Sequence, residues 1–208
     1  GGKRWRPLLT ACAYQALAGG EPASALPHAV RKVAVATECF HKASLLHDDL
    51  EDNDEFRYGQ PTPGRRLGMP IALNLGDYLI GEGYRLLAES GLPPASQARL
   101  LRVAAEGHRS LCLGQGAELC RVREPAELTT AEVLNIFRQK TAPAFEVALR
   151  LGAICAGADE AVEQSIKRFS EALGVAFQIR DDLEDGVGRE SSGAENNGRA
   201  SILISLAG

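Results

Sequence analysis

The chain has 208 residues, of which 45% are hydrophobic and 24% charged, and its formal net charge is −4. A chain of this length and composition can bury one sizeable core, so we expect a single domain over residues 1–208 and exclude extensive disorder. The small negative charge excludes broad electrostatic attraction to nucleic acid or anionic membranes. Any anion must therefore be recognised by a local cluster of basic residues.

Cysteine usage and hydropathy indicate a cytoplasmic protein. The five cysteines lie in apolar periodic segments without CxxC or Cys/His metal spacing, so they are predicted to be reduced core residues. We expect no leader and no apolar run long enough to span a bilayer. The first and last residues fall close to recognisable motifs, which favours truncation at one or both ends.

Apolar residues recur at intervals of three and four, and alternating β-branched runs are absent, so helices are expected throughout and no sheet. Glycine and proline divide the chain into six or seven helices. The expected breaks, in chain order, are at Gly19 to Pro27, Gly59 to Gly64, Gly91 to Pro94, Arg123 to Pro125, Gly157, and Gly186 to Gly198. The last break is polar and predicted to be a mobile loop. The predicted fold class is all-α, an antiparallel helical bundle.

An acidic string, DDLED, occupies Asp48 to Asp52. On a helix turning about 100° per residue, offsets of three, seven and eleven return near the starting angle. A polar stripe therefore holds His41, Ser44, Asp48 and Asp52. Carboxylates one turn apart, with Asp49 beside them, can share a hard divalent cation, and Mg²⁺ is the natural choice.

The same string, DDLED, recurs at Asp181 to Asp185. Gln178, Asp182 and Asp185 lie near one face of a helix beginning at about Asp159, with Asp181 at its edge. Clustered carboxylates repel one another without a cation, so a metal with an anionic ligand is expected, and the two clusters suggest one shared site. A solvated acidic helix end is the alternative for either cluster alone. The predicted metal ligands are Asp48, Asp49, Asp52, Asp181, Asp182 and Asp185.

Basic residues suited to phosphate accompany both clusters. They are Lys3, Arg4, Arg6, Arg57 and Lys140, the last followed by Thr141. Each one alone would more often be an ordinary surface charge, and their placement around the carboxylates is what favours an anion site.

Five strings in order resemble the motifs of the trans-isoprenyl diphosphate synthases, the polyprenyl synthetase family. They are GGKRWRP, His41 with HDDLEDND, FRYGQPT, RQKTA and FQIRDDLED. The resemblance covers essentially the whole chain. It implies a bundle around a central cavity, a homodimer, and Mg²⁺-dependent condensation of an allylic diphosphate with isopentenyl diphosphate.

Residue by residue, the resemblance places isopentenyl diphosphate on Lys3, Arg6 and His41. It places the allylic diphosphate on Mg²⁺ held by Asp48, Asp52 and Asp181. The residues that assist there are Arg57, Lys140, Thr141 and Gln178. Asp48, Asp52, Lys140 and Asp181 are the implied catalytic residues, because metals and basic groups stabilise charge on the departing diphosphate.

The chain departs from the family pattern at several positions. Tyr58 stands where the family usually has a second arginine, and losing that contact would cost roughly 1.5–3 kcal/mol of binding unless Arg4 replaces it. Gly64 stands at a common histidine position, and Arg199 replaces a lysine. GQGAE at Gly114 to Glu118 resembles a GQxxD string of the family but is assigned no catalytic role, because its glycines also allow close helix contact.

Two small residues precede the first cluster, Ala43 and Ser44. By resemblance they leave room for a long tail and indicate a product of C20 or longer, with Phe145, Tyr78 or Tyr84 as candidate floors. Close helix packing is the alternative explanation of their size.

Two other functions remain open. A class I terpene cyclase would ionise the same diphosphates but has no need of Lys3, Arg6 and His41. A non-catalytic partner subunit that binds prenyl diphosphates is compatible with Tyr58 and Gly64, although it need not retain two metal-type carboxylate clusters.

Overall fold

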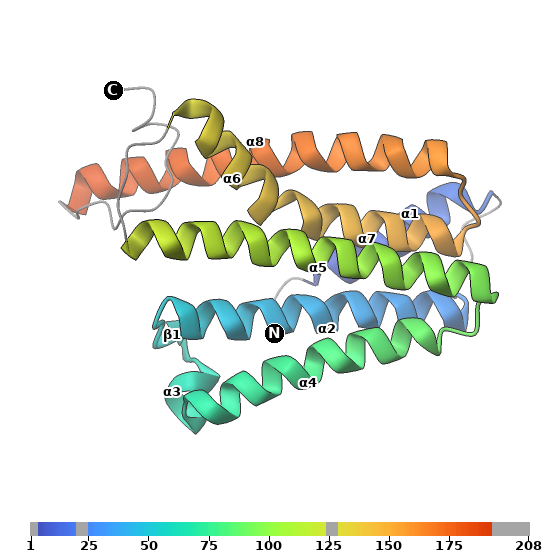
Figure 1. The fold of residues 1–208 in the computed structure, drawn as a ribbon, viewed down its shortest axis with the longest axis horizontal. Coiled ribbons are helices and arrows are strands. Elements are labelled where there is room, and N and C mark those ends of the chain that lie inside the picture. The colour runs from blue at the N-terminus through green and yellow to red at the C-terminus, as the bar shows by residue number, and fades with distance from the viewer. Residues whose placement is uncertain (1–3, 20–24, 124–128, 193–208) are drawn as a thin grey trace. The chain divides into compact units, whose positions relative to one another are not determined.

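A computed structural model describes residues 4–19, 25–123 and 129–192, without the side chains of Val122 and residues 184–192. The all-α prediction is confirmed (Figure 1). The helices are α1 (Trp5–Leu17), α2 (His28–Glu51), α3 (Pro63–Leu67), α4 (Met69–Ala88), α5 (Pro94–Arg123), α6 (Thr130–Lys140), α7 (Ala142–Cys155) and α8 (Glu160–Ser192). Among these described helices, none is both long and apolar enough to cross a membrane.

The chain forms two compact units. The first holds the described residues up to Ala104 together with Val147–Glu163. The second holds Ala105–Glu146 together with the described residues from Gln164 onward. The first acidic cluster therefore belongs to the first unit and the second cluster to the second.

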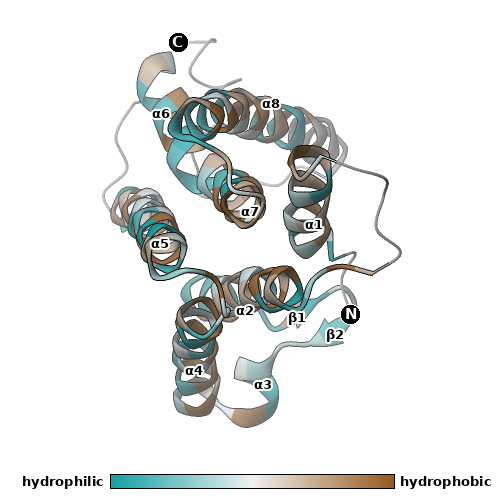
Figure 2. Cartoon of the chain, turned by 90° about the vertical axis from the view of Figure 1, so that its right-hand side faces the viewer, coloured by the Kyte–Doolittle hydropathy of each residue, from teal (hydrophilic) through white to brown (hydrophobic). Residues whose placement is uncertain are grey.

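In the first unit, α2 packs against α4 and α1 (Figure 2). The core is made of small and branched apolar residues, Val33, Ala36, Leu87, Leu100, Val103, Ala104, Leu151 and Ile154. Glycines let helices approach closely: a Cβ at Gly83 of α4 would lie 2.6 Å from the Phe40 ring of α2. A Cβ at Gly152 of α7 would lie 2.2 Å from the backbone oxygen of Thr10 in α1.

The second unit has a smaller core in which Val133 and Phe137 of α6 pack with Leu134 and Ile179. Thr129 begins α6 with a capping box, in which its hydroxyl accepts from the backbone of Glu132 and the Glu132 carboxylate accepts from the backbone of Thr129. Such reciprocal bonds satisfy amides that the helix itself leaves unpaired.

The structure corrects three expectations. A two-stranded antiparallel hairpin, β1 (Phe56–Arg57) with β2 (Gln60–Pro61), interrupts the helices. The expected loop after Gly186 is helical as far as Ser192, because extending an existing helix needs no new nucleation. The cysteines are free as expected, but Cys12, Cys112 and Cys120 are exposed and are not core residues.

Candidate functional site

The C-terminal end of α2 carries the first acidic cluster. The helix ends at Glu51, and the backbone amide of Asp52 donates to the backbone oxygen of Asp48 at 2.9 Å, so the two carboxylates stand one turn apart. Carboxylates at the negative end of a helix dipole strengthen the attraction for a cation. This end of α2 therefore favours a positively charged guest.

Asp49 lies between them in sequence but turns into the protein, where it is 4% exposed. Its carboxylate accepts a hydrogen bond from the Arg57 guanidinium, which also lies 3.8 Å from the carboxylate of Asp54. Burial acts to lower the pKa of Arg57, but the bond from Asp49 and the surrounding carboxylates outweigh it and raise that pKa. Arg57 is thus a fixed cation beside the first cluster.

The hairpin that carries Arg57 is held by its turn and by Thr62. Tyr58 and Gly59 have φ of 51° and 73°, and such positive values at both central residues belong to a tight hairpin turn. Thr62, which is 1% exposed, donates its hydroxyl to the backbone oxygen of Asp54 at 2.8 Å and its amide to that of Glu55 at 2.9 Å.

Arg6 of α1 meets His41 of α2 on the same stripe as Asp48. The guanidinium of Arg6 lies 2.9 Å from Nε2 of His41 and donates to it. Burial, and then the charge of Arg6, lower the pKa of His41 to about 3. A neutral imidazole is the state that can accept from Arg6. Burial also lowers the pKa of Arg6, against the opposing influence of Glu38, Tyr58 and Asp48.

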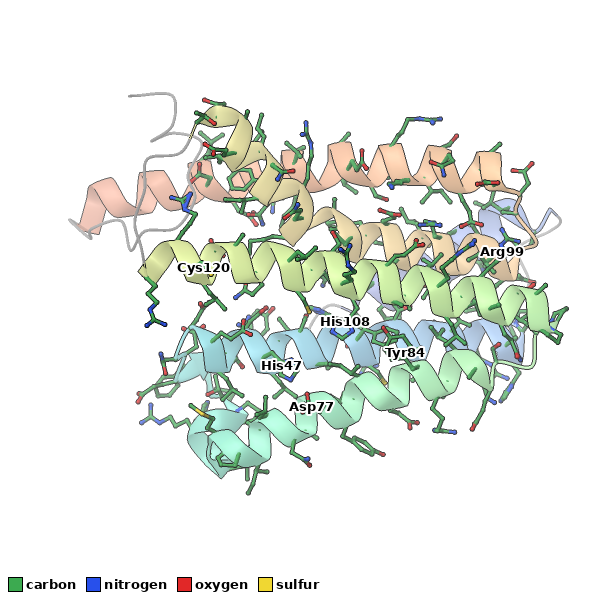
Figure 3. The ribbon with its side chains drawn as sticks, in the orientation of Figure 1. His47, Asp77, Tyr84, Arg99, His108 and Cys120 are labelled. Atoms are coloured by element: carbon green, nitrogen blue, oxygen red, sulfur yellow. The ribbon has the colours of Figure 1, made fainter. Side chains whose placement is uncertain are left out.

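One residue before Asp48, His47 faces Asp77 of α4 (Figure 3). Nε2 of His47 lies 3.4 Å from Oδ1 of Asp77. The imidazole fits there because α4 has a glycine at position 76, where a Cβ would come within 2.2 Å of Nε2. The side chain of Asp77 is 64% exposed.

In the second unit, Lys140 and Thr141 occupy the junction of α6 and α7. Pro143 explains the break, because proline has no amide hydrogen and its ring would clash with the carbonyl four residues earlier in a continuous helix. The ammonium of Lys140 donates to the carboxylate of Glu118 in α5. Glu118 belongs to the GQGAE string, which the sequence alone did not connect with Lys140.

The second acidic cluster lies on α8, where a Cβ at Gly174 would be 2.6 Å from the backbone of Ala142, next to Thr141. Gln178 and Asp181 follow Gly174 by one and two turns on the same face of α8. Asp181 accepts from Arg180 at 3.0 Å. The second unit thus brings this face of α8 toward the junction that carries Lys140.

The carboxylates of the first acidic cluster match the ligands that a hard cation requires only in part. No group of three His, Cys, Asp or Glu side chains gathers for a metal among the residues that the structure describes. Mg²⁺, however, usually takes one or two carboxylates and completes its shell with water and phosphate. Asp48 and Asp52 suit that arrangement, whereas Asp49 is engaged by Arg57. Lys3 and the side chain of Asp185 lie outside the described parts of the chain.

The departures from the family pattern have structural counterparts. Tyr58 is 80% exposed at the hairpin turn. A Cβ at Gly64 would lie 2.8 Å from the Leu50 side chain, so a histidine there would require Leu50 to move. The packing of α3 against the end of α2 therefore favours glycine at this position.

The residues discussed for tail length are placed differently. Ala43 is 1% exposed in the core, and Ser44 donates to the backbone oxygen of His41 at 3.0 Å. Tyr84 packs edge-on against Phe40 with ring centroids 5.0 Å apart, whereas Tyr78 is 64% exposed and forms no floor within its unit. In the second unit, Phe145 lies 6.0 Å from Phe177, centroid to centroid.

Comparison with known proteins gives consistent matches. A family model described as polyprenyl synthetase matches residues 1–199. The farnesyl diphosphate synthase of Geobacillus stearothermophilus is 37% identical over 223 residues, covering 100% of this chain and 72% of the relative. The geranylgeranyl pyrophosphate synthase of Geoglobus acetivorans is 33% identical, covering 94% of this chain and 59% of the relative.

A solved structure agrees with these relatives. The geranyltransferase of Helicobacter pylori, in complex with magnesium and isoprenyl diphosphate, superposes with a TM-score of 0.84 at 27% identity, covering 100% of this chain and 71% of that chain. The chain thus spans between 59% and 72% of the length of these three proteins.

Proposed function

Because this chain belongs to the polyprenyl synthetase family, we propose that it is a prenyltransferase that condenses an allylic prenyl diphosphate with isopentenyl diphosphate. The observation that carries the proposal is the 2.9 Å contact of Arg6 with His41 on the same helical stripe as Asp48. A cation held next to the acidic stripe suits a second diphosphate. An enzyme that only ionises an allylic diphosphate binds no second diphosphate and does not need this cation.

The homoallylic substrate is assigned to Lys3, Arg6 and His41, the first by resemblance alone. Burial keeps His41 neutral, so its Nε2 accepts from the guanidinium of Arg6 and fixes it, while the other ring nitrogen has a hydrogen to donate to the substrate. The remaining N–H groups of Arg6 can then form parallel bonds to a diphosphate.

The residues assigned to the allylic diphosphate follow from the family resemblance. In the first unit Asp48 and Asp52 would hold Mg²⁺, and Arg57 would bind the diphosphate oxygens. In the second unit we assign Lys140, Thr141, Gln178 and Asp181. Bound Mg²⁺ would stabilise the negative charge that develops on the departing diphosphate.

In the proposed reaction, the side chains of this protein bind and orient the two substrates. The allylic carbon–oxygen bond breaks, the double bond of isopentenyl diphosphate supplies the electron pair for a new carbon–carbon bond, and a proton is lost to restore an alkene. Arg57 and Lys140 stabilise the leaving diphosphate, and Arg6 with His41 keeps the second substrate oriented. Released diphosphate is the proposed acceptor of the proton.

We assign a product of C20 or longer from the small residues Ala43 and Ser44. Ser44 lies on the acidic stripe one turn before Asp48, and a larger side chain there would obstruct a tail. The relatives make products of different length, a farnesyl and a geranylgeranyl diphosphate among them.

A cytoplasmic homodimer is the proposed state. The free cysteines suit a reducing compartment. For the subunit contact we assign the face of α4 that carries Ile71, Leu75 and Tyr78, which share one stripe and are 56%, 37% and 64% exposed. An apolar stripe of this kind on a surface helix is typical of a protein contact.

A non-catalytic partner subunit is the second candidate. The exposed tyrosine at position 58, in place of a second arginine, is the observation that favours it. Such a protein would bind prenyl diphosphates without joining them.

The test is incubation of the full-length protein with Mg²⁺, isopentenyl diphosphate and, separately, dimethylallyl, geranyl and farnesyl diphosphates, followed by mass spectrometry. Elongated products that disappear in Asp48→Ala are expected. Hydrocarbons or alcohols instead would indicate a cyclase. Binding of allylic diphosphates without any product would indicate the partner subunit.

A further inference from the structure

Glu118 is the acidic residue of the GQGAE string, and it is 9% exposed in the second unit. Its carboxylate accepts a hydrogen bond from the ammonium of Lys140, 22 positions later in the sequence. A carboxylate removed from water is tolerated when a hydrogen-bonded cation accompanies it. Lys140 supplies that cation, so the two side chains form a half-buried charged pair.

Close approach of α5 to α6 makes the pair possible. Gly114 lies one turn before Glu118, and a Cβ there would come within 2.9 Å of the carbonyl carbon and Cβ of Gln139. Gln139 directly precedes Lys140. A larger residue at position 114 would push α5 away from α6 close to the charged pair. The glycine and the glutamate of the string therefore act together, one turn apart on α5.

The pair leaves Lys140 able to bind a second anion. A lysine ammonium has three donors, and Glu118 takes one of them. The long stem of lysine is flexible, and ordering it upon binding reduces affinity and blurs orientation. Because Glu118 already holds the Lys140 side chain, that side chain loses little further conformational freedom when a ligand binds.

We propose that Glu118 is a positioning residue that holds the Lys140 ammonium where it meets the diphosphate. The proposal rests on the function proposed above for the role of Lys140, and it extends that function to a string otherwise explained by helix packing. Glu118 itself touches Lys140 and not the substrate. Its effect should therefore appear only while Lys140 is present.

The first test observes the lysine ammonium groups by NMR in the full-length protein. The chain has five lysines, Lys3, Lys32, Lys42, Lys140 and Lys167. We expect a Lys140 signal protected from solvent exchange, identified by its absence in Lys140→Arg and shifted by Mg²⁺ with inorganic diphosphate. Glu118→Gln, which preserves the side-chain shape, should abolish it. Glu106→Gln, at an exposed position of the same helix, should leave it unchanged. A Lys140 signal that persists in Glu118→Gln would overturn the proposal.

The second test is a double-mutant cycle on turnover. Glu118→Gln should lower kcat by about tenfold, as expected for loss of an interaction made in the transition state. Glu118→Asp keeps the negative charge on a shorter side chain, so its kcat should lie between that of Glu118→Gln and that of the unmodified protein. Adding Glu118→Gln to Lys140→Met should cause no further loss. If the fold-losses of kcat caused by the two single substitutions multiply in the double variant, Glu118 acts independently of Lys140, and the positioning role is wrong.

Two controls separate the possible failures. Thermal unfolding of each variant shows whether it folds, and if Glu118→Gln does not, Glu118→Asp replaces it in both tests, with a Lys140 signal that is weakened and a kcat that falls less than tenfold as the expected results. If the unmodified protein elongates no primer, the proposed function fails. The NMR response of Lys140 to Mg²⁺ and diphosphate then decides the positioning role by itself.

Discussion

Asp49 is buried, whereas Asp52, three residues later, is exposed. The difference follows from their surroundings, because the hairpin brings Arg57 against Asp49 while Asp52 caps the end of α2. The buried pair of Asp49 with Arg57 and the surface carboxylate of Asp52 therefore contribute differently to the free energy of unfolding, although they belong to one DDLED string.

Neutralising Asp49 should cost far more than neutralising an exposed partner of arginine. Asp49→Asn is expected to lower the free energy of unfolding by about 1–3 kcal/mol, because Arg57 loses a charged acceptor. Glu55→Gln removes the exposed pair with Arg65 and should cost less than about 1 kcal/mol. Urea unfolding of both variants measures this, and equal costs would contradict the prediction.

His41 should make the protein sensitive to acid. Its pKa is about 3 in the folded chain against a model-peptide value of 6.5. Between these values the unfolded chain binds a proton that the folded chain does not, so the contribution is complete above pH 6.5 and is lost as the pH falls toward 3.

His41→Gln keeps an acceptor for Arg6 but cannot titrate. Its unfolding free energy should therefore fall less steeply than that of the unmodified protein between about pH 7 and pH 5. Urea unfolding at both pH values provides the comparison. Parallel slopes in the two proteins would show that His41 is not the sensitive group.

At the scale of the helices, close contact between two helices depends on particular glycines. The sequence around a glycine does not show whether it lies at such a contact. Gly152 of α7 lies against the backbone of Thr10 in α1, whereas a Cβ at Gly81 of α4 would have nothing within 4 Å. Both glycines occupy helix interiors, so their sequence context alone would suggest the same effect of substitution.

Gly152→Ala should destabilise the first unit by about 1–3 kcal/mol, because a methyl group cannot fit against a backbone oxygen without moving α1. Gly81→Ala should stabilise the protein by up to about 1 kcal/mol, since alanine is the better helix former. Thermal unfolding of both variants tests the prediction. It is wrong if Gly152→Ala unfolds at the temperature of the unmodified protein.

Most helix boundaries could be predicted from glycine and proline. The breaks near Gly19, Gly91 and Gly157 are present, each with a glycine of positive φ. The hairpin was missed because its strands have only two residues each, too short to show an alternating pattern. The end of α8 was missed because polar residues with glycine resemble a loop even where a long helix continues through them.

At the scale of the molecule, the homodimer is tested through the apolar stripe of α4. Sedimentation equilibrium should give twice the chain mass of 22.2 kDa. Ile71→Glu combined with Leu75→Glu should shift the protein to monomer, because charges placed in an apolar contact lose water without gaining a partner.

Leu113→Glu is the matched control. Leu113 of α5 is also an exposed apolar residue, with 51% of its surface accessible, but it lies outside the α4 stripe. This variant should remain dimeric. Monomer in the unmodified protein, or dimer in the α4 variant, would place the subunit contact elsewhere or exclude it.

The sequence by itself determined the helical class, most breaks, and the stripe that places His41, Ser44, Asp48 and Asp52 on one face. These properties depend on the local period of a helix, which can be counted along the chain. The five motif strings carried the family resemblance in the same way, residue by residue.

Only the tertiary structure decided which charged groups pair. Arg6 meets His41, Arg57 meets Asp49, and Lys140 meets Glu118 across separations of 35, 8 and 22 residues. Such partners depend on how closely helices and turns approach, and that approach is set by packing at small residues such as Gly114 and Gly152. Local periodicity contains no information about it, because a helix has the same pattern whichever neighbour it packs against.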